Sequence, residues 1–182
     1  FLPMDSGGKF LSTVNKNKKE LQIWKKIAII GSINMDIVSE RNSNFQSRGE
    51  TVKGLEFRTC PGGKGANQAV AAKRLGADVV MFGKVGDDIY GKQALQVLEN
   101  SGVDIRHVET CQGVNTGIAV IHVNKEGENY IVIQEGANKH VDIDYIKKDP
   151  AVPGYMRPGA AAAGDPDGNR KEGRAILCRT RD

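Results

Sequence analysis

The fold is decided by the stretch Pro61-Gly62-Gly63-Lys64-Gly65-Ala66-Asn67-Gln68-Ala69-Val70-Ala71-Ala72-Lys73-Arg74-Leu75-Gly76-Ala77, which predicts a tight loop running directly into a helix. Glycine lets a backbone approach a ligand closely, because no Cβ intervenes and positive φ costs little. The unpaired N–H groups at the start of the helix favour an anion or an array of hydroxyls. Lys64 adds a cation, and Asn67 adds a donor and an acceptor. The alternative is that Gly62 to Gly65 only allow the helix to pack closely on a sheet, and a short glycine pattern alone does not decide between the two.

The charge of the chain argues against a nucleic-acid partner. The 182 residues carry a formal net charge of +4, but this charge lies at the two ends. Residues 1–26 hold six lysines and two acidic groups, and residues 151–182 hold six basic and four acidic groups, so residues 27–150 have a net charge of −2. A nucleic-acid-binding module is expected to carry its basic patch on the folded part. We therefore expect no nucleic acid as the main partner.

The cysteines and histidines predict neither a disulfide framework nor a metal site. Cys60, Cys111 and Cys178 are scattered and odd in number, which is typical of a reducing cytosol, and no Cys/His cluster suggests zinc. No apolar run approaches the length of a membrane span, and the first residues lack the apolar core of a signal peptide. We expect a cytoplasmic protein without a membrane partner. Residues 1–25 are expected to form a disordered N-terminal extension.

A buried strand is predicted over Ile27–Ile30, a short continuous apolar run that ends at Gly31. From Ser32 to Val38 polar and apolar residues alternate, which places Ser32, Asn34 and Asp36 on one face. Open α/β sheets bind ligands at the carboxyl ends of their central strands, so Asn34 and Asp36 are candidate binding residues. The alternative is that both side chains cap a turn.

The next elements alternate between strand and helix. Residues 51–58 predict a half-exposed strand that forms a flap. A small-residue helix over 66–75 is terminated by Gly76, and a buried strand follows over 78–83. Asp87 or Asp88 caps a helix over 89–100, with Gly102 as its stop. This order predicts an α/β fold with a parallel sheet.

The last regular elements are a hairpin and an unfinished helix. Strands are predicted over 116–123 and 129–134, joined by a five-residue loop. Asp142 or Asp144 is expected to cap a helix that starts at Tyr145. From Asp149 onward prolines and glycines are frequent and no apolar period persists, so residues 149–182 are expected to form a disordered tail outside the domain of residues 26–148.

Several motifs occur in a fixed order over residues 27–148. They are Gly31-Ser32-Ile33-Asn34-Met35-Asp36, Gly49-Glu50-Thr51, Gly62-Gly63-Lys64-Gly65-Ala66-Asn67-Gln68, Gly83-Lys84-Val85-Gly86-Asp87-Asp88, Thr116-Gly117-Ile118-Ala119, Gly127-Glu128-Asn129 and Gly136-Ala137-Asn138. In this order and spacing they resemble the N-terminal part of the PfkB carbohydrate kinase family, and its ribokinase branch in particular. The resemblance implies a three-layer α/β/α fold with a mostly parallel sheet, truncated here, and a small β lid formed by residues 37–59 and 116–134.

The resemblance also implies a sugar kinase that transfers a phosphoryl group from ATP to D-ribose. A set of six residues is expected to bind the sugar, namely Asn34, Asp36, Gly62, Gly63, Lys64 and Asn67. The lid is expected to close over the sugar, exclude water and form a homodimer interface.

The second half of the family supplies the ATP site, a Mg²⁺-linked motif and a catalytic Asp, with a monovalent cation as a further option. None of these follows residue 148, since Ala163-Gly164-Asp165 only superficially matches the family's anion loop. We therefore expect no catalytic residue, no metal ligand and no kinase activity in this chain alone. Another sugar or nucleoside kinase of the family stays open, as does an inactive sugar-binding or dimerising fragment that is truncated or frame-disrupted near Asp149. A dinucleotide-binding oxidoreductase and a P-loop are excluded, because the required glycine and Ser/Thr positions are not met.

Overall fold

The fold is taken from a computed structural model, which describes residues 27–41, 48–148, 161–163 and 175–179. The expected N-terminal extension over residues 1–25 lies outside the described residues, so its disorder stays a prediction. The described elements are β1 (Ile27–Ile30), β2 (Asn34–Glu40), β3 (Glu56–Gly62), α1 (Lys64–Arg74), β4 (Val79–Gly86), α2 (Ile89–Asn100), β5 (Asp104–Cys111), β6 (Gly117–Val123), β7 (Asn129–Gln134), η3 (Gly136–His140), α3 (Ile143–Lys148), β8 (Ala161–Ala163) and β9 (Ala175–Arg179).

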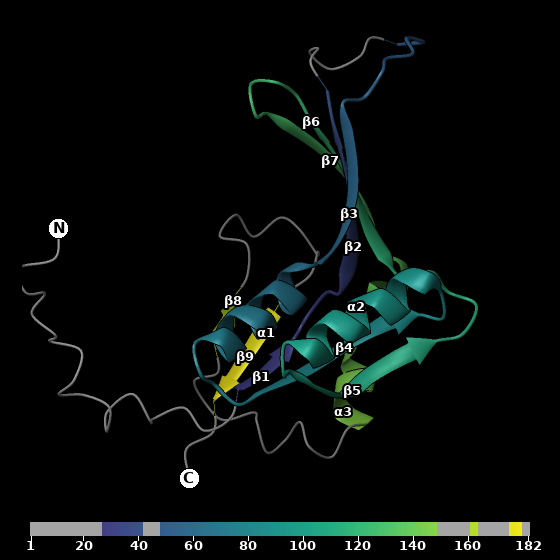
Figure 1. The fold of residues 1–182 in the computed structure, drawn as a ribbon. Helices are drawn as coiled ribbons and strands as arrows, with labels where there is room; N and C mark the ends of the chain where they lie inside the picture. The colour runs from purple at the N-terminus through teal and green to yellow at the C-terminus, as the bar shows by residue number, and fades with distance from the viewer. Residues whose placement is uncertain (1–26, 42–47, 149–160, 164–174, 180–182) are drawn as a thin grey trace, which may run out of the picture.

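The main sheet has the strand order β5-β4-β1-β9-β8 (Figure 1). β1 and β4 are parallel, as are β4 and β5, while β9 is antiparallel to both β1 and β8. β1 and β4 form where apolar runs were found, and three of the four residues of β1 are buried. Strands buried on both faces are typical of a parallel sheet covered by helices. The predicted α/β class is therefore confirmed.

The two long helices have the expected sequence signals at their ends. At the start of α2 the Asp88 carboxylate accepts a hydrogen bond from the Gly91 N–H at 2.8 Å, as an N-cap does. Gly76 follows α1 with φ +92°, and Gly102 follows α2 with φ +78°. Glycine takes up this left-handed conformation at little cost, which is why both helices end there.

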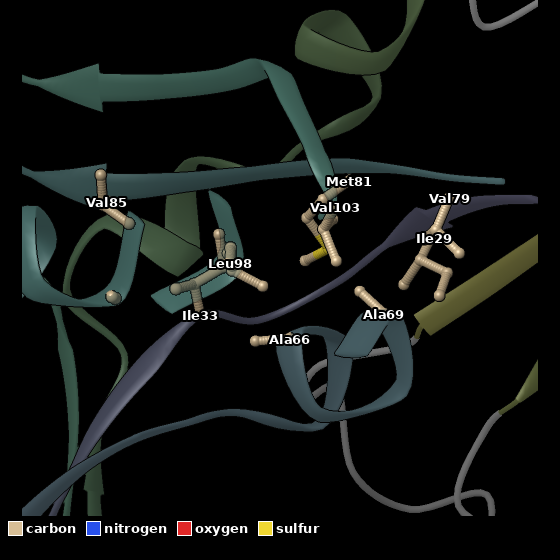
Figure 2. Packing of buried hydrophobic residues seen from close by; sticks show 10 residues of the cluster. Ile29, Ile33, Ala66, Ala69, Val79, Met81, Val85, Leu98 and Val103 are labelled. Carbon is tan, nitrogen blue, oxygen red and sulfur yellow. The ribbon is translucent and has the colours of Figure 1, made fainter. Parts of the chain in front are cut away.

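The core lies on both faces of the main sheet. On one face α1 and α2 cover a cluster centred on Ile29, Met81 and Leu98, and Figure 2 shows how these side chains meet between helices and strands. On the other face α3 packs Tyr145 and Ile146 against the opposite sides of β1 and β4. Helices on both faces of one sheet make three layers, as the resemblance implied.

A small sheet of β3-β2-β6-β7 stands away from these layers (Figure 1). β2 pairs antiparallel with β3 and parallel with β6, and β6 and β7 form the predicted hairpin. The hairpin loop is held by the buried Asn124, whose Oδ1 accepts hydrogen bonds from the N–H groups of Glu126 and Glu128. The expected lid segments, 37–59 and 116–134, overlap this sheet.

Two elements differ from the sequence-based expectation. The strand predicted over 51–58 lies at Glu56–Gly62. Gly62 and Pro61, which has no backbone N–H, are tolerated there because β3 is an edge strand of the small sheet and pairs on one side only. β5 was not predicted, because its half-buried and exposed positions follow no regular alternation and it includes several charged side chains. β5 is an edge strand of the main sheet, where such a composition suffices.

The stretch from Asp149 to Asp182 includes two strands that the sequence analysis did not expect. β9 pairs with β1 over Ile27–Ile30, and β8 pairs with β9. The N–H and C=O groups on that side of β1 need partners, and an extended segment supplies them. The other residues of this stretch lie outside the described ones, and their disorder stays a prediction.

Candidate sugar-binding site

Asn34 begins β2 at the point where the chain passes from the main sheet into the small sheet. Only 9% of its surface is exposed. Across the small sheet it lies opposite Gly62 of β3 and Gly117 of β6. The polar side chain of Asn34 is therefore flanked on both sides by residues without a Cβ, which leaves room around its amide.

Asp36 lies two residues further along β2, on the same face as Asn34. A Cβ on Gly62 would lie 2.2 Å from the Asp36 Oδ2 atom, so only glycine leaves space for this carboxylate. Partial burial raises the pKa of Asp36 above its usual value. Among the described residues, no hydrogen bond reaches the Asp36 carboxylate. The Asp36 carboxylate is therefore partly shielded from solvent, and its oxygens remain available as hydrogen-bond acceptors.

Gly63 connects β3 to α1 in a conformation that only glycine adopts readily. Its φ is +95°, and a Cβ here would lie 2.6 Å from the Ser32 carbonyl oxygen and 2.9 Å from the Asn34 nitrogen. The loop is fixed in place because the Ala66 N–H donates to the Ser32 carbonyl at 3.1 Å. The start of α1 is thus held directly against the segment that carries Asn34.

Lys64 and Asn67 lie on the exposed side of the first turn of α1. Asn67 lines a cavity of about 260 Å³ between α1 and α2, together with Gly62 and Ile33. The structure therefore brings together four of the six predicted residues, Asn34, Asp36, Gly62 and Gly63. Lys64 and Asn67 border this group from the helix, and neither side chain has a described contact with Asn34 or Asp36.

Asn138 was not among the predicted site residues, although the structure places its side chain in contact with one of them, Asn34. Its Nδ2 donates to the Asn34 Oδ1 atom at 2.7 Å, and its Oδ1 accepts from the Ile33 N–H at 2.9 Å. These residues are more than 100 positions apart in the chain. The Gly-Ala-Asn motif was the available signal, but a motif does not say which residue its side chain contacts.

A second cluster, formed by Asp88 and Thr116, anchors β6 beside α2. The Asp88 carboxylate accepts from the Thr116 hydroxyl at 2.6 Å and from the Thr116 N–H at 2.8 Å, while the hydroxyl accepts from the Gly86 N–H at 2.9 Å. Desolvation acts to raise the pKa of Asp88, but hydrogen bonds from Thr116 and Gly91 outweigh it and hold this pKa below its usual value. This carboxylate is fully engaged within the protein and has a structural role.

The part of the chain that the structure describes offers no group of three or more His, Cys, Asp or Glu residues that would hold a metal ion. Within the same residues, no helix is both long and apolar enough to cross a membrane.

The geometry places a carboxylate acceptor and amide groups beside a glycine loop, and comparisons with known proteins give the family of the chain. Residues 25–150 match the model of the pfkB family carbohydrate kinases. The chain belongs to this family, and the resemblance seen in its motifs is confirmed.

Relatives within the family match this chain over a similar share of their own length. A ribokinase of Bacillus subtilis is 48% identical over 121 residues, covering 66% of this chain and 41% of the relative. A deoxyribokinase of Salmonella typhi is 41% identical over 126 residues, covering 68% and 41%. The structure of an Arabidopsis thaliana ribokinase complexed with ribose and ATP has a TM-score of 0.59 and 31% identity, covering 69% of this chain and 42% of that one. The chain thus spans about two fifths of the length of these relatives.

Proposed function

We propose that this chain forms the acceptor-sugar side of an ATP-dependent sugar kinase that converts D-ribose to ribose 5-phosphate. The observation that carries the proposal is the Asp36 carboxylate, which is half buried, has a raised pKa and has no donor among the described residues. Such a carboxylate is stabilised by a ligand that brings hydroxyl donors. Sugars are ligands of this kind.

Each of the six proposed site residues contributes something different to a sugar. Ionised Asp36 accepts hydrogen bonds from two vicinal hydroxyls, and the Asn34 amide contributes a donor beside it. Gly62 and Gly63 let the sugar approach the backbone, since no Cβ stands between. Lys64 and Asn67 supply a charge and an amide at the start of α1. Together they hold the sugar in one orientation, which is what phosphoryl transfer to a single hydroxyl requires.

The nature of the sugar follows from the relatives rather than from the site alone. Relatives named as ribokinase and deoxyribokinase favour a pentose, and the complex of the Arabidopsis enzyme with ribose makes ribose the first candidate. Another sugar or a nucleoside is the second candidate. Turnover of ribose, 2-deoxyribose, fructose and adenosine by the corresponding full-length kinase separates these substrates.

Phosphoryl transfer also needs groups that the described residues do not offer. ATP supplies the phosphoryl group when bound, and Mg²⁺ and a catalytic Asp are expected for the family. We assign no residue of this chain to ATP, Mg²⁺ or a monovalent cation, and we name no catalytic residue in it. We therefore expect ribose binding without kinase activity from the 182-residue chain.

The small sheet supports two further parts of the proposal. Its strand β2 carries Asn34 and Asp36, and closure of the sheet over a bound sugar excludes water that would compete as phosphoryl acceptor. Its β3 and β7 strands expose large apolar side chains, among them Phe57, Ile131 and Val132 with exposed fractions of 50% to 70%. Apolar patches of this kind are typical of protein interfaces, so we propose a homodimer through this sheet. We place the kinase in the cytoplasm, with no nucleic-acid or membrane partner.

Calorimetric titration of the chain with D-ribose tests the proposal. The wild-type chain is expected to bind ribose, and Asp36→Asn is expected to weaken binding about 100-fold or more, since hydrogen bonds to a charged group contribute about 1.5–3 kcal/mol each. Asp144→Asn, on the exposed first turn of α3, is the matched control and is expected to bind like wild type.

Two results would count against the proposal, namely no ribose binding by the folded wild-type chain, or equal binding by the Asp36→Asn variant. A coupled assay separates the enzymatic alternatives. Ribose-dependent formation of ADP by the chain alone would contradict the expected inactivity. Binding without turnover is also what a sugar-binding fragment predicts, and sequencing the gene around the Asp149 codon tests whether the reading frame is disrupted there.

A further inference from the structure

The side chain of Asn138 joins the turn η3 to the beginning of β2. Its Oδ1 accepts from the Ile33 N–H at 2.9 Å, and its Nδ2 donates to the Ile33 carbonyl at 3.1 Å and to the Asn34 Oδ1 at 2.7 Å. These three hydrogen bonds join five atoms, all of which belong to the protein. Asn138 therefore contacts Asn34 without being placed in the sugar site itself.

The orientation of both amides follows from one backbone group. The oxygen and nitrogen of an amide side chain are ordinarily assigned from their neighbours. Here the Ile33 N–H can only donate, so the Asn138 atom beside it must be the oxygen. The Asn138 nitrogen then faces Asn34 and can only donate, so the Asn34 atom that meets it must be its oxygen. The Asn34 Nδ2 is left as the outward group of this amide.

The neighbouring strand is shaped to admit this contact. A Cβ on Gly117 would lie 2.1 Å from the Asn138 Nδ2 and 2.5 Å from the Asn34 Oδ1. Any other residue at position 117 would displace one of the two amides. This glycine is independent support for the contact, because it lies on a different element from either asparagine.

We infer that Asn138 is a positioning residue that fixes Asn34 as a hydrogen-bond donor toward the sugar. The inference rests on the proposed sugar site. Within the described residues the Asn34 Nδ2 has no hydrogen-bond partner, and it lies on the same face of β2 as the Asp36 carboxylate. A donor next to an acceptor matches a hydroxyl group, which accepts from Asn34 while it donates to Asp36. Asn34 and Asp36 would then bind a deoxy sugar, in which hydrogen replaces this hydroxyl group, more weakly.

The first test needs no sugar. Asn138→Asp keeps an acceptor for the Ile33 N–H but removes both donors, so Asn34 is expected to turn and donate its Nδ2 to the new carboxylate. Nuclear magnetic resonance then detects slower exchange of the Asn34 side-chain amide protons with solvent than in wild type. Asn129→Asp, at an exposed position of β7, is the matched control and leaves this exchange unchanged. An unchanged exchange rate in Asn138→Asp overturns the inference.

The second test measures affinity for D-ribose and its monodeoxy analogues by calorimetry. Asn138→Asp is expected to weaken ribose binding about tenfold and to reduce the preference for ribose over one deoxy analogue. In an Asn34→Ala background the same change is expected to alter affinity less than about twofold. Equal losses in both backgrounds indicate a merely structural role and overturn the inference.

The outcomes remain distinguishable from failure of the proposed function. If wild type binds no ribose, the proposed function fails, and the amide exchange result decides the orientation of Asn34 by itself. If circular dichroism shows that Asn138→Asp does not fold, Asn138→Ala replaces it. That variant releases the Asn34 amide, and ribose affinity is expected to fall about threefold. An unchanged affinity in Asn138→Ala overturns the inference.

Discussion

Two carboxylates at the base of the small sheet, Asp36 on β2 and Asp88 before α2, have opposite surroundings. Asp88 accepts hydrogen bonds from Thr116 and Gly91, and its pKa is lowered. Asp36 accepts none among the described residues, and burial raises its pKa. The two differ in whether the protein supplies the donors. Where it does, the carboxylate stabilises the fold, and where it does not, the carboxylate is available to a ligand.

The largest expected effect is on the cluster of Asp88 and Thr116, and it concerns the free energy of unfolding. Thr116→Val removes the hydroxyl and leaves the buried Gly86 N–H without its acceptor, which is expected to lower the free energy of unfolding by about 2–3 kcal/mol. Urea unfolding followed by circular dichroism measures the change. Thr110→Val, on an exposed position of β5, is the control and should stay within about 0.5 kcal/mol of wild type. If the free energy of unfolding of Thr116→Val also stays within about 0.5 kcal/mol of wild type, the cluster does not stabilise the fold.

A smaller loss is expected from Asp88→Asn, which keeps an acceptor at the start of α2 but removes the charge. The free energy of unfolding is expected to fall by about 1 kcal/mol at pH 7. Because the pKa of Asp88 is lowered on folding, its contribution is present above the usual Asp pKa of about 3.9 and is lost as the pH falls through the folded value. The difference between variant and wild type should therefore disappear in strong acid. The neighbouring Asp87→Asn is the control, and a pH-independent difference would contradict the assignment.

The smallest effect, and one of opposite sign, is expected from Asp36→Asn. The pKa of Asp36 is raised on folding, so its contribution to stability is complete below about pH 3.9 and is lost as the pH rises through the folded value. At pH 7 the neutral amide is therefore expected to give a slightly higher Tm than wild type, and the two should converge near pH 3. Thermal melts at both pH values measure this, and a lower Tm at pH 7 would mean that Asp36 has protein donors after all.

The helices and strands that sequence analysis predicts well in this chain are those with a local sequence signal. β1, α1, β4, α2 and the β6–β7 hairpin each carry a local signal, such as an apolar run, a cap or a loop of suitable length, and the structure confirms them. The edge strands β3 and β5 carry weaker signals, because one side of each is unpaired and tolerates proline, glycine or charge. Local patterns therefore predict β1 and β4, inside the main sheet, better than the edge strands β3 and β5. The edge strand β7 is predicted because its hairpin loop carries a signal.

The candidate site likewise contains residues that sequence motifs predict and residues that only the structure identifies. Asn34, Asp36, Gly62 and Gly63 lie in two motifs, and pairing of β2 with β3 brings these motifs together. Asn138 and Thr116 owe their places to contacts with distant residues, and their own surroundings in the sequence carry no hint of these partners. That Gly117 must lack a Cβ is likewise evident only once both amides are in place.

The parallel pairing of β2 with β6 has a mechanical consequence. Both strands enter the small sheet at the same end, with Asn34 opposite Gly117. The sheet is therefore attached to the main domain at this end, and its other end projects away. Each strand has seven residues, which corresponds to a length of roughly 23 Å at about 3.3 Å per residue. A rotation of roughly 10° at the anchored end would thus move the far end by roughly 4 Å, with little change around Asn34 itself. A spectroscopic label on the loop after Asn124 would report such a swing with the greatest sensitivity.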